Sequence, residues 1–244
     1  GRFYSMAKKL PELSIFFPFW NEEENIEEVI SRAIAIAPKF ALKWEIIMVD
    51  DGSSDRTLEI ANYLASKNQN LKVVSLHPNR GYGAALRAGF DHAGYKFIVF
   101  TDGDLQFDFS EITKFIEKIE DADVVIGYRK KRRDRNLLKR LLLMSILKIA
   151  DHVMFGISFK DIDCGFKMIK KDALEAIGPL RSEGAMITTE LLVKAVRKKL
   201  KISQVGVEHF PREYGVQTGA NVPVVLRAIL ESLMLWLDIR NKRI

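Results

Sequence analysis

Three oxygen-bearing side chains stand close together in the segment "IVFTDGDLQFD" at residues 98–108. Asp102 and Asp104 flank Gly103, and Gln106 follows two residues later. Asp and Gly are common turn residues, so the segment can be an ordinary turn after a buried strand. Neighbouring carboxylates repel each other, however, unless a cation lies between them, and Mg²⁺ or Mn²⁺ prefers oxygen ligands. The segment therefore predicts either a turn or a divalent metal site.

A second pair of carboxylates, Asp50 and Asp51, lies in the segment "VDDGSSDRT". Gly52 permits a tight turn there, and Ser54 and Asp55 can cap the helix that follows. Capping does not account for two adjacent carboxylates directly after an apolar run. We therefore interpret them as hydrogen-bond acceptors for a ribose or for the edge of a base.

The segment "NRGYGAALRAG" contains Gly81 and Gly83 and is similar to a glycine-rich phosphate loop. It lacks the Gly-Lys-Ser/Thr of the P-loop and the third glycine of the dinucleotide-binding fingerprint. The glycines can contact a phosphate, or they can let a helix pack closely on the sheet. Both interpretations stay open at this point.

Short apolar runs alternate with amphipathic stretches through the first half of the chain. The predicted strands lie at 13–19, 44–50, 71–77, 96–102 and 122–128. Amphipathic helices are predicted between them, the first entered through Asn21 as N-cap. This alternation predicts an α/β fold, a single Rossmann-like domain with a mostly parallel central sheet and helices on both faces. In such sheets the ligand lies beyond the carboxyl ends of the strands, where the polar segments above stand.

The second half of the chain is less regular. A long amphipathic segment is predicted at about 136–155, a helix at 188–199, a strand at 201–210 and a last amphipathic helix at 222–240. The first and last of these can pack on the core or lie in a membrane interface. We predict a tag or disordered N-terminus at 1–11, one domain at 12–215, and a C-terminal amphipathic helix within 216–244.

Composition limits the class of protein. The chain has 244 residues, a net charge of +6 and one cysteine, which excludes an intrachain disulfide and a cysteine metal cluster. No segment reaches the roughly 18 apolar residues of a membrane span, and no secretory signal opens the chain. Eight of the twelve residues at 129–140 are basic, which suits an anionic membrane surface or a solvated loop. Nucleic acid is not expected, because no aromatic residue is interleaved with this run.

Five segments together resemble one family: "PFWNEEENI", "VDDGSSDRT", "NRGYGAALRAGF", "TDGDLQ" and "DCGFK". In this order they are similar to family 2 glycosyltransferases of the GT-A fold, and most of all to dolichyl-phosphate mannose synthases and other polyprenyl-phosphate glycosyltransferases. The resemblance implies an inverting, metal-dependent transfer of mannose or glucose from GDP-mannose or UDP-glucose to polyprenyl phosphate. It also implies a peripheral protein at the cytoplasmic face of a membrane. A saccharide hydroxyl is the alternative acceptor.

The resemblance also implies roles for particular residues. It implies Mg²⁺ or Mn²⁺ held by Asp102, Asp104 and Gln106. Arg129 stands where an arginine reaches a phosphate, and Glu190 where an acidic residue faces the sugar, so that both join Asp104 as expected catalytic residues. The expected nucleotide-sugar pocket comprises Pro18, Trp20, Glu22, Asp50, Asp51, Gly81, Asp102, Lys167 and Arg212.

The nature of the acceptor determines whether a base is needed. A lipid phosphate is already anionic near neutral pH and needs no strong base, so the four histidines need no catalytic role. A hydroxyl acceptor would need a carboxylate base. Glu190 is the first candidate for that base, and Asp161 or Asp163 is the next.

Overall fold

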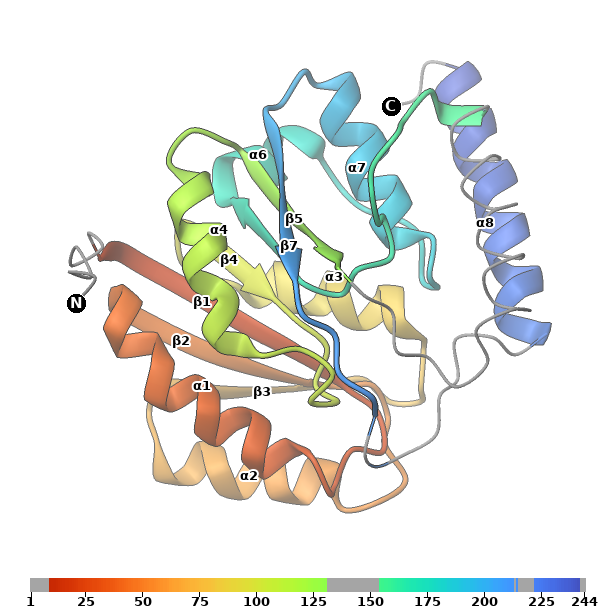
Figure 1. Cartoon of the computed structure of the whole chain (residues 1–244). Helices are drawn as coiled ribbons and strands as arrows, with labels where there is room; N and C mark the ends of the chain where they lie inside the picture. Colours follow the sequence, from red (N-terminus) through yellow and green to blue (C-terminus); the bar gives the residue numbers. More distant parts are fainter. Residues whose placement is uncertain (1–8, 131–153, 213, 215–221, 242–244) are drawn as a thin grey trace.

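A computed structural model describes residues 9–130, 154–212, 214 and 222–241 of the chain. The described residues form one seven-stranded sheet with the order β3-β2-β1-β4-β6-β5-β7 (Figure 1). All neighbouring strands are parallel except β6, which runs antiparallel to β4 and β5. The predicted mostly parallel sheet is confirmed. The strands are β1 (Leu10–Phe19), β2 (Ala41–Asp50), β3 (Leu71–Ser75), β4 (Phe97–Phe100), β5 (Val124–Arg129), β6 (Lys167–Lys170) and β7 (Ile202–Val207).

Helices cover both faces of this sheet, as predicted. Successive strand residues point to opposite faces, so that Ile15 and Phe17 join one core while Phe16 joins the other. The first core is covered by α1 (Ile26–Phe40), α2 (Thr57–Lys67) and α4 (Ile112–Ile119), which follows a short 3₁₀ turn, η1 (Phe109–Glu111). The second core is covered by α3 (Tyr82–His92), α6 (Lys171–Ile177) and α7 (Ile187–Arg197).

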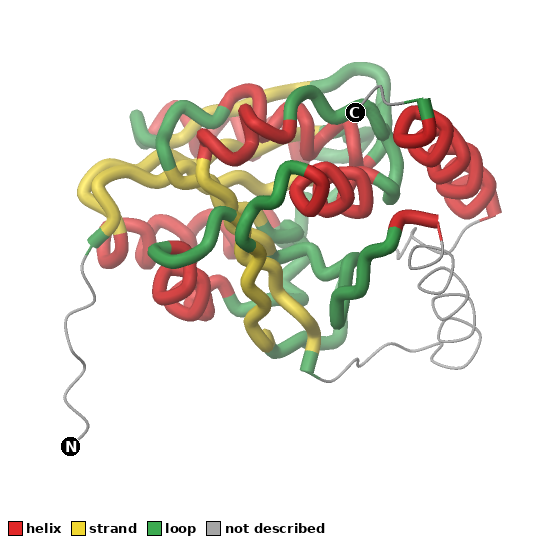
Figure 2. Tube along the Cα trace, turned by 90° about the horizontal axis from the view of Figure 1, so that it is seen from above, coloured by secondary structure: helices red, strands yellow, loops and turns green. Residues whose placement is uncertain are grey.

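The last helix, α8 (Val222–Arg240), lies outside the second layer of helices, at the flank of the domain (Figure 2). Leu235 points inward and is 5% exposed in the second core. The opposite side of α8 carries apolar side chains that are 46–66% exposed: Leu226, Ile229, Leu230, Leu233, Met234 and Leu237. Their spacing of three and four residues places them in one stripe along the helix. Among the described helices, none is long and apolar enough to cross a bilayer.

The strand order has a reversal next to β1. The chain proceeds outward from β1 to β2 and β3, and then returns to place β4 on the other side of β1. Such a reversal opens a crevice at the carboxyl ends of the two strands that meet there. The segments that follow β1, β2 and β4 begin at this crevice, so topology brings Glu22, Asp50 and Asp102 to the same end of the sheet.

Several predicted boundaries differ from the structure. The first strand begins at Leu10, inside the stretch that we expected to be a tag or disordered. Asn21 is not the N-cap of α1, because that helix begins only at Ile26. Asn21 instead takes a left-handed conformation, and its Oδ1 accepts a hydrogen bond from the Ser54 backbone N–H at 2.8 Å. The amphipathic segment predicted at 136–155 lies almost entirely outside the described residues.

The antiparallel strand β6 has a consequence for the site. Because it runs against β4, its first residue, Lys167, pairs with Phe100 at the end of β4. The segment that precedes β6, "DIDCGF", therefore lies beside the segment that follows β4. A Cβ at Gly165 would lie 2.1 Å from Oδ2 of Asp102, so only glycine permits this approach.

Candidate active site

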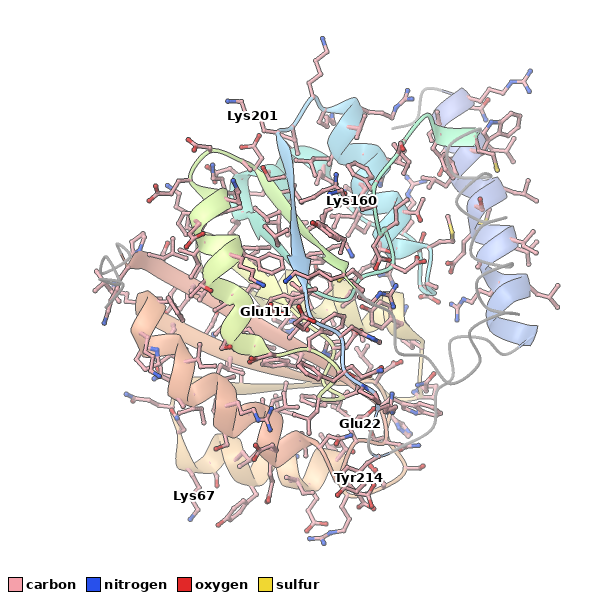
Figure 3. All side chains as sticks on the ribbon, viewed as in Figure 1. Glu22, Lys67, Glu111, Lys160, Lys201 and Tyr214 are labelled. Carbon is pink, nitrogen blue, oxygen red and sulfur yellow. The ribbon has the colours of Figure 1, made fainter. Side chains whose placement is uncertain are left out.

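The end of the sheet that carries the crevice gathers most of the predicted site residues. Glu22 follows β1, Asp50 ends β2 with Asp51 directly after it, and Asp102 follows β4. Figure 3 shows Glu22 at this end of the sheet near Tyr214, with Lys201 at the opposite end. Trp20 is 41% exposed beside the same edge, which leaves its ring available to a base or a ribose.

Asp102 and Asp104 lie close enough to affect each other's protonation. Oδ1 of Asp102 accepts a hydrogen bond from the Tyr82 hydroxyl at 2.9 Å. Loss of solvent, and then the charge of Asp104, raise the pKa of Asp102 to about 7. Loss of solvent also raises the pKa of Asp104, although Arg212 opposes this rise. The protein therefore holds two carboxylates where ionisation of both is unfavourable without an added cation.

This donor set fits a hard divalent cation. The described part of the chain contains no cluster of three or more His, Cys, Asp or Glu side chains placed to hold a metal. Mg²⁺ commonly binds through only one or two carboxylates and completes its shell with water and substrate phosphates. Gln106 is the third predicted ligand, and its Nε2 donates to the Phe210 carbonyl at 3.1 Å. That bond holds the Gln106 side chain against the segment after β7.

Arg212 links two of the predicted site carboxylates. Its Nη1 donates to Oδ2 of Asp104 at 3.3 Å, and its Nη2 donates to Oε1 of Glu22. Loss of solvent raises the pKa of Glu22 to about 7, against hydrogen bonds from Asn25 and Arg212. Because Arg212 lies 108 residues from Asp104 along the chain, only the fold brings them together.

Asp50 and Asp51 bind the protein's own backbone. Asp51 accepts hydrogen bonds from the backbone N–H of Arg80 at 2.9 Å and of Gly81 at 2.8 Å. The side-chain amide of Asn79 donates a third bond to it at 3.0 Å. Asp50 accepts longer bonds from the Ser53 N–H at 3.3 and 3.4 Å. Asp51 thus fixes the turn at 79–81, and a direct contact of either carboxylate with a nucleotide stays a prediction.

The two glycines of the "NRGYG" segment serve close packing. Gly81 has a φ of +107°, which favours glycine. A Cβ at Gly83 would lie 2.6–2.7 Å from backbone atoms of residues 182–184, and the Gly83 N–H donates to the Glu183 carbonyl at 2.8 Å. The close packing that these two glycines permit is against the segment 182–184 and not against the sheet, as we had expected for the packing interpretation. A contact of Gly81 with the donor stays a prediction.

Two predicted phosphate-binding cations are directed to protein acceptors. Arg129 forms a two-pronged ion pair with Asp161, with Nε–Oδ2 at 2.7 Å and Nη2–Oδ1 at 2.8 Å. Lys167 is 1% exposed and its Nζ donates to the carbonyls of Ile162, at 2.9 Å, and of Cys164. Both cations therefore hold the turn at 161–164 next to Asp102, where their charges offset part of the rise in the pKa of Asp102. A contact of either cation with a phosphate stays a prediction.

The contacts of Glu190 do not support the prediction that it faces the sugar. Its carboxylate is 2% exposed and accepts hydrogen bonds from the backbone N–H of Arg181 at 3.0 Å and of Ser182 at 2.8 Å. It also pairs with Lys194 at 2.7 Å. Burial alone would raise the pKa of Glu190, but these bonds outweigh it and lower the pKa. A covered carboxylate with a lowered pKa is a poor base, so the contacts favour a structural role.

The family follows from the match of residues 14–178 to the model of "Glycosyl transferase family 2". The chain belongs to glycosyltransferase family 2. The match contains the carboxylates after β1, β2 and β4, whereas Arg212, which joins two of them, lies beyond it.

Two curated glycosyltransferases illustrate the sequence similarity. The chain is 30% identical over 234 residues to a dodecaprenyl-phosphate galacturonate synthase of Rhizobium johnstonii, covering 95% of this chain and 68% of that protein. It is 32% identical over 219 residues to the dolichyl-phosphate beta-glucosyltransferase of Saccharomyces cerevisiae, covering 80% of this chain and 66% of that protein. The chain thus spans about two thirds of the length of these relatives.

Solved structures support the same glycosyltransferase fold. Glucosyl-3-phosphoglycerate synthase of Mycobacterium tuberculosis, in complex with Mn²⁺, UDP and glucosyl-3-phosphoglycerate, superposes with a TM-score of 0.67 at 21% identity. The superposition covers 93% of this chain and 80% of that one. At this identity the likeness concerns the fold, and the GT-A fold expected from the motifs is confirmed.

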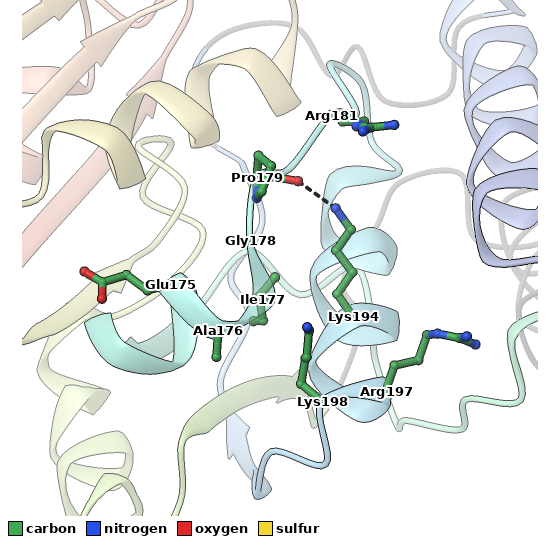
Figure 4. A pocket seen from close by; sticks show the side chains of 9 residues that line it. All are labelled: Glu175, Ala176, Ile177, Gly178, Pro179, Arg181, Lys194, Arg197 and Lys198. Atoms are coloured by element: carbon green, nitrogen blue, oxygen red, sulfur yellow. Dashed lines mark hydrogen bonds between the residues drawn. The ribbon is translucent and has the colours of Figure 1, made fainter. Parts of the chain in front are cut away.

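Two residues next to the candidate site were not predicted from the sequence. Tyr82 stands in a quoted motif, but nothing in the sequence signals its bond to Asp102. Glu183 was also missed, although its carboxylate pairs with Arg80 at 2.6 Å next to the turn that Asp51 fixes. A separate pocket of about 340 Å³ lies between the end of α6 and α7, where Lys194 donates to the Pro179 carbonyl at 2.6 Å (Figure 4). None of the predicted site residues lines that pocket.

Proposed function

We propose that the protein transfers a glycosyl group, with inversion, from a nucleotide sugar to a polyprenyl phosphate. The observation that carries this proposal is the carboxylate pair Asp102 and Asp104 at the crevice beside β4, joined to Glu22 through Arg212. Both curated relatives described above are named for transfer to a polyprenyl or dolichyl phosphate. Their names differ in the sugar, galacturonate in one and glucose in the other, so the names leave the sugar open. GDP-mannose and UDP-glucose, the donors expected from the motifs, are tested first.

A divalent cation, Mg²⁺ or Mn²⁺, fits the site and would be held by Asp102 and Asp104, with Gln106 close by. When bound, such a cation neutralises negative charge on the diphosphate that leaves. Arg212 contributes a second positive charge at the same place, because its guanidinium already lies between Asp104 and Glu22. Tyr82 orients Asp102 through its hydroxyl. These residues bind and orient the donor diphosphate.

The state of the candidate bases favours a phosphate acceptor over a hydroxyl. Glu190 is covered and bound to backbone amides and Lys194, and Asp161 is held by both prongs of Arg129. A hydroxyl acceptor needs a free base within reach, whereas a phosphate acceptor is already an anion. Two of the three candidate bases are thus occupied, which supports a polyprenyl phosphate as the acceptor, whereas Asp163 is exposed and is the base that a hydroxyl acceptor would have to use.

A lipid acceptor requires contact with a membrane, and α8 offers a surface for it. The exposed apolar stripe of α8 has the spacing of an interfacial helix. The basic run that begins at Arg129 suits anionic headgroups, although residues 131–140 lie outside the described part of the chain. We therefore place the exposed stripe of α8 in the membrane interface, with the protein bound peripherally. The donor binds at the crevice beside β4.

A screen of donors and acceptors tests the proposal. UDP-glucose and GDP-mannose, each with Mn²⁺ or Mg²⁺, are offered with a short polyprenyl phosphate or with saccharide acceptors. We expect nucleoside diphosphate release and a glycosylated lipid product only with the polyprenyl phosphate. A saccharide product with no lipid product would overturn the choice of acceptor. No product with either class, from a folded protein, would overturn the choice of mannose or glucose as the sugar that this chain transfers.

A further inference from the structure

Four consecutive backbone amides, from Arg181 to Gly184, are held by two carboxylates of different helices. Glu190 of α7 accepts from Arg181 and Ser182. Glu231 of α8 accepts from Glu183 at 3.0 Å and from Gly184 at 3.0 Å. Glu190 and Glu231 therefore fix the position of segment 181–184 from one side.

The other side of this segment contacts the start of α3. The carbonyl of Glu183 accepts hydrogen bonds from the amides of Gly83, at 2.8 Å, and Ala84, at 3.2 Å. The Glu183 carboxylate pairs with Arg80 at 2.6 Å and with Arg87 at 3.2 Å. Because Gly83 leaves no room for a Cβ between the two segments, a shift of 181–184 must move the start of α3 as well.

The start of α3 in turn holds two carboxylates of the proposed donor site. The amides of Arg80 and Gly81 bind Asp51, and the Tyr82 hydroxyl binds Asp102. A continuous series of contacts thus runs from α8, through segment 181–184 and the start of α3, to both carboxylates. Each of these contacts is a hydrogen bond or a close backbone approach.

We propose that Glu231 is a positioning residue of the donor site. It acts through the amides of Glu183 and Gly184, which set the place of the 79–84 segment and so of Asp51 and Asp102. The Glu231 side chain is only 13% exposed, and carboxylate bonds to backbone amides are stronger than neutral ones. Its ion pair with Arg227 at 3.2 Å adds a second connection, because Arg227 also pairs with the Glu183 carboxylate at 2.8 Å and donates to the Arg80 carbonyl at 3.2 Å. This second connection is the more screened of the two, since the Arg227 side chain is 42% exposed. The effect on catalysis rests on the proposed function, while the effect on segment 79–84 does not.

Four variants separate this role from simple packing of α8. Glu231→Ala removes the acceptor, and Glu231→Gln keeps an oxygen that can accept from both amides. Leu235→Ala loosens the packing of α8 and leaves the carboxylate in place. Asp238→Asn is the matched control for charge, since Asp238 pairs with the side chain of Arg181, which is 62% exposed, at 3.1 Å.

Hydrogen exchange of the ligand-free protein gives the first readout, on peptides that cover 79–84 and 181–184. We expect faster exchange in both segments for Glu231→Ala, near-parent exchange for Glu231→Gln, and no change in 79–84 for Leu235→Ala or Asp238→Asn. Unchanged exchange of 79–84 in Glu231→Ala would overturn the proposal. So would equal acceleration by Leu235→Ala, since packing of α8 alone would then explain the effect.

Binding of UDP and GDP with Mn²⁺, measured well below the unfolding temperature of each variant, gives the second readout. We expect Glu231→Ala to raise the Kd of the nucleotide that the parent binds by about fivefold or more, in the range of ordinary couplings between sites. We expect Glu231→Gln to restore most of the affinity. Parent-like affinity of Glu231→Ala would overturn the effect on the donor. A folded parent that binds neither nucleotide would refute the proposed function, and the exchange data would still decide the role of Glu231.

Discussion

Replacing Asp102 by Asn should make the metal-free protein more stable at pH 8. In the fold, the pKa of Asp102 rises from the ordinary value of 3.8 to about 7 through loss of solvent and the charge of Asp104. The folded state therefore retains a proton between about pH 4 and pH 7 that the unfolded state has lost. The contribution of this group to the free energy of unfolding is thus largest below pH 4, falls as the pH rises to 7, and is constant above.

The size of the effect follows from the same pKa. At 1.36 kcal/mol per pKa unit, a rise from 3.8 to about 7 corresponds to about 4 kcal/mol. Asp102 keeps partial contact with solvent, which screens its charge, so we expect about 1–3 kcal/mol. Asn keeps an oxygen for the Tyr82 hydroxyl and removes the charge next to Asp104.

Urea unfolding at pH 5, 6, 7 and 8 in the presence of a chelator measures this difference. Asp121→Asn is the control, because Asp121 is an exposed carboxylate that precedes β5 and so lies at the other end of the sheet from the crevice. We expect the stability advantage of Asp102→Asn over the parent to grow with pH, and that of Asp121→Asn to stay constant. Adding Mn²⁺ should then stabilise the parent more than Asp102→Asn. Parallel curves for the parent and Asp102→Asn would refute the reasoning on the carboxylate pair.

Three further predictions concern the proposed site and its surroundings. Asp104→Ala should abolish sugar transfer, because it removes one of two carboxylates for the cation; full activity in chelator-treated buffer would contradict the metal site. Asp51→Ala should weaken nucleoside diphosphate binding more than it slows turnover of saturating donor, since the turn at 79–81 loses three hydrogen bonds; calorimetry that shows parent-like binding would leave Asp51 with a purely local role. Leu230→Glu, in the exposed stripe of α8, should reduce binding to anionic vesicles and slow transfer to a lipid phosphate in vesicles, with donor hydrolysis unchanged; equal vesicle binding by variant and parent would place the membrane contact elsewhere.

The alternation of strands and helices in the first half of the chain was predictable because it depends on local pattern. Residues 13–19 and 44–50 are apolar runs of strand length, and each lies within an observed strand. The rule that ligands bind beyond the carboxyl ends of parallel strands then placed Asp50 and Asp102 at one edge. Predicted ends of elements were less accurate, as at Asn21, because its Oδ1 bonds to Ser54, 33 residues away.

Contacts between distant segments could not be predicted from one sequence. The short strand β6 is antiparallel, and its pairing with β4 brings Gly165 against Asp102. The pairing of Arg129 with Asp161 also depends on this arrangement, and it turns an expected phosphate ligand toward a carboxylate of the protein. Glu190 has an acidic side chain in a suitable motif, yet its partners are the amides of a loop that the sequence does not locate.

The sequence by itself determined the fold class, the family and the carboxylates at the strand ends. Each of these depends on the residue types within short segments, which specify where a strand ends in a turn and which polar groups that turn carries. Only the tertiary structure decided which of these polar groups face one another. Arg212 reaches Glu22 and Asp104, and Glu231 reaches the segment beside α3, because the strand order and the packing of α8 bring together residues that are far apart in the chain. A charge acts on whatever lies within a few ångströms of it, and that neighbourhood is a property of the folded chain.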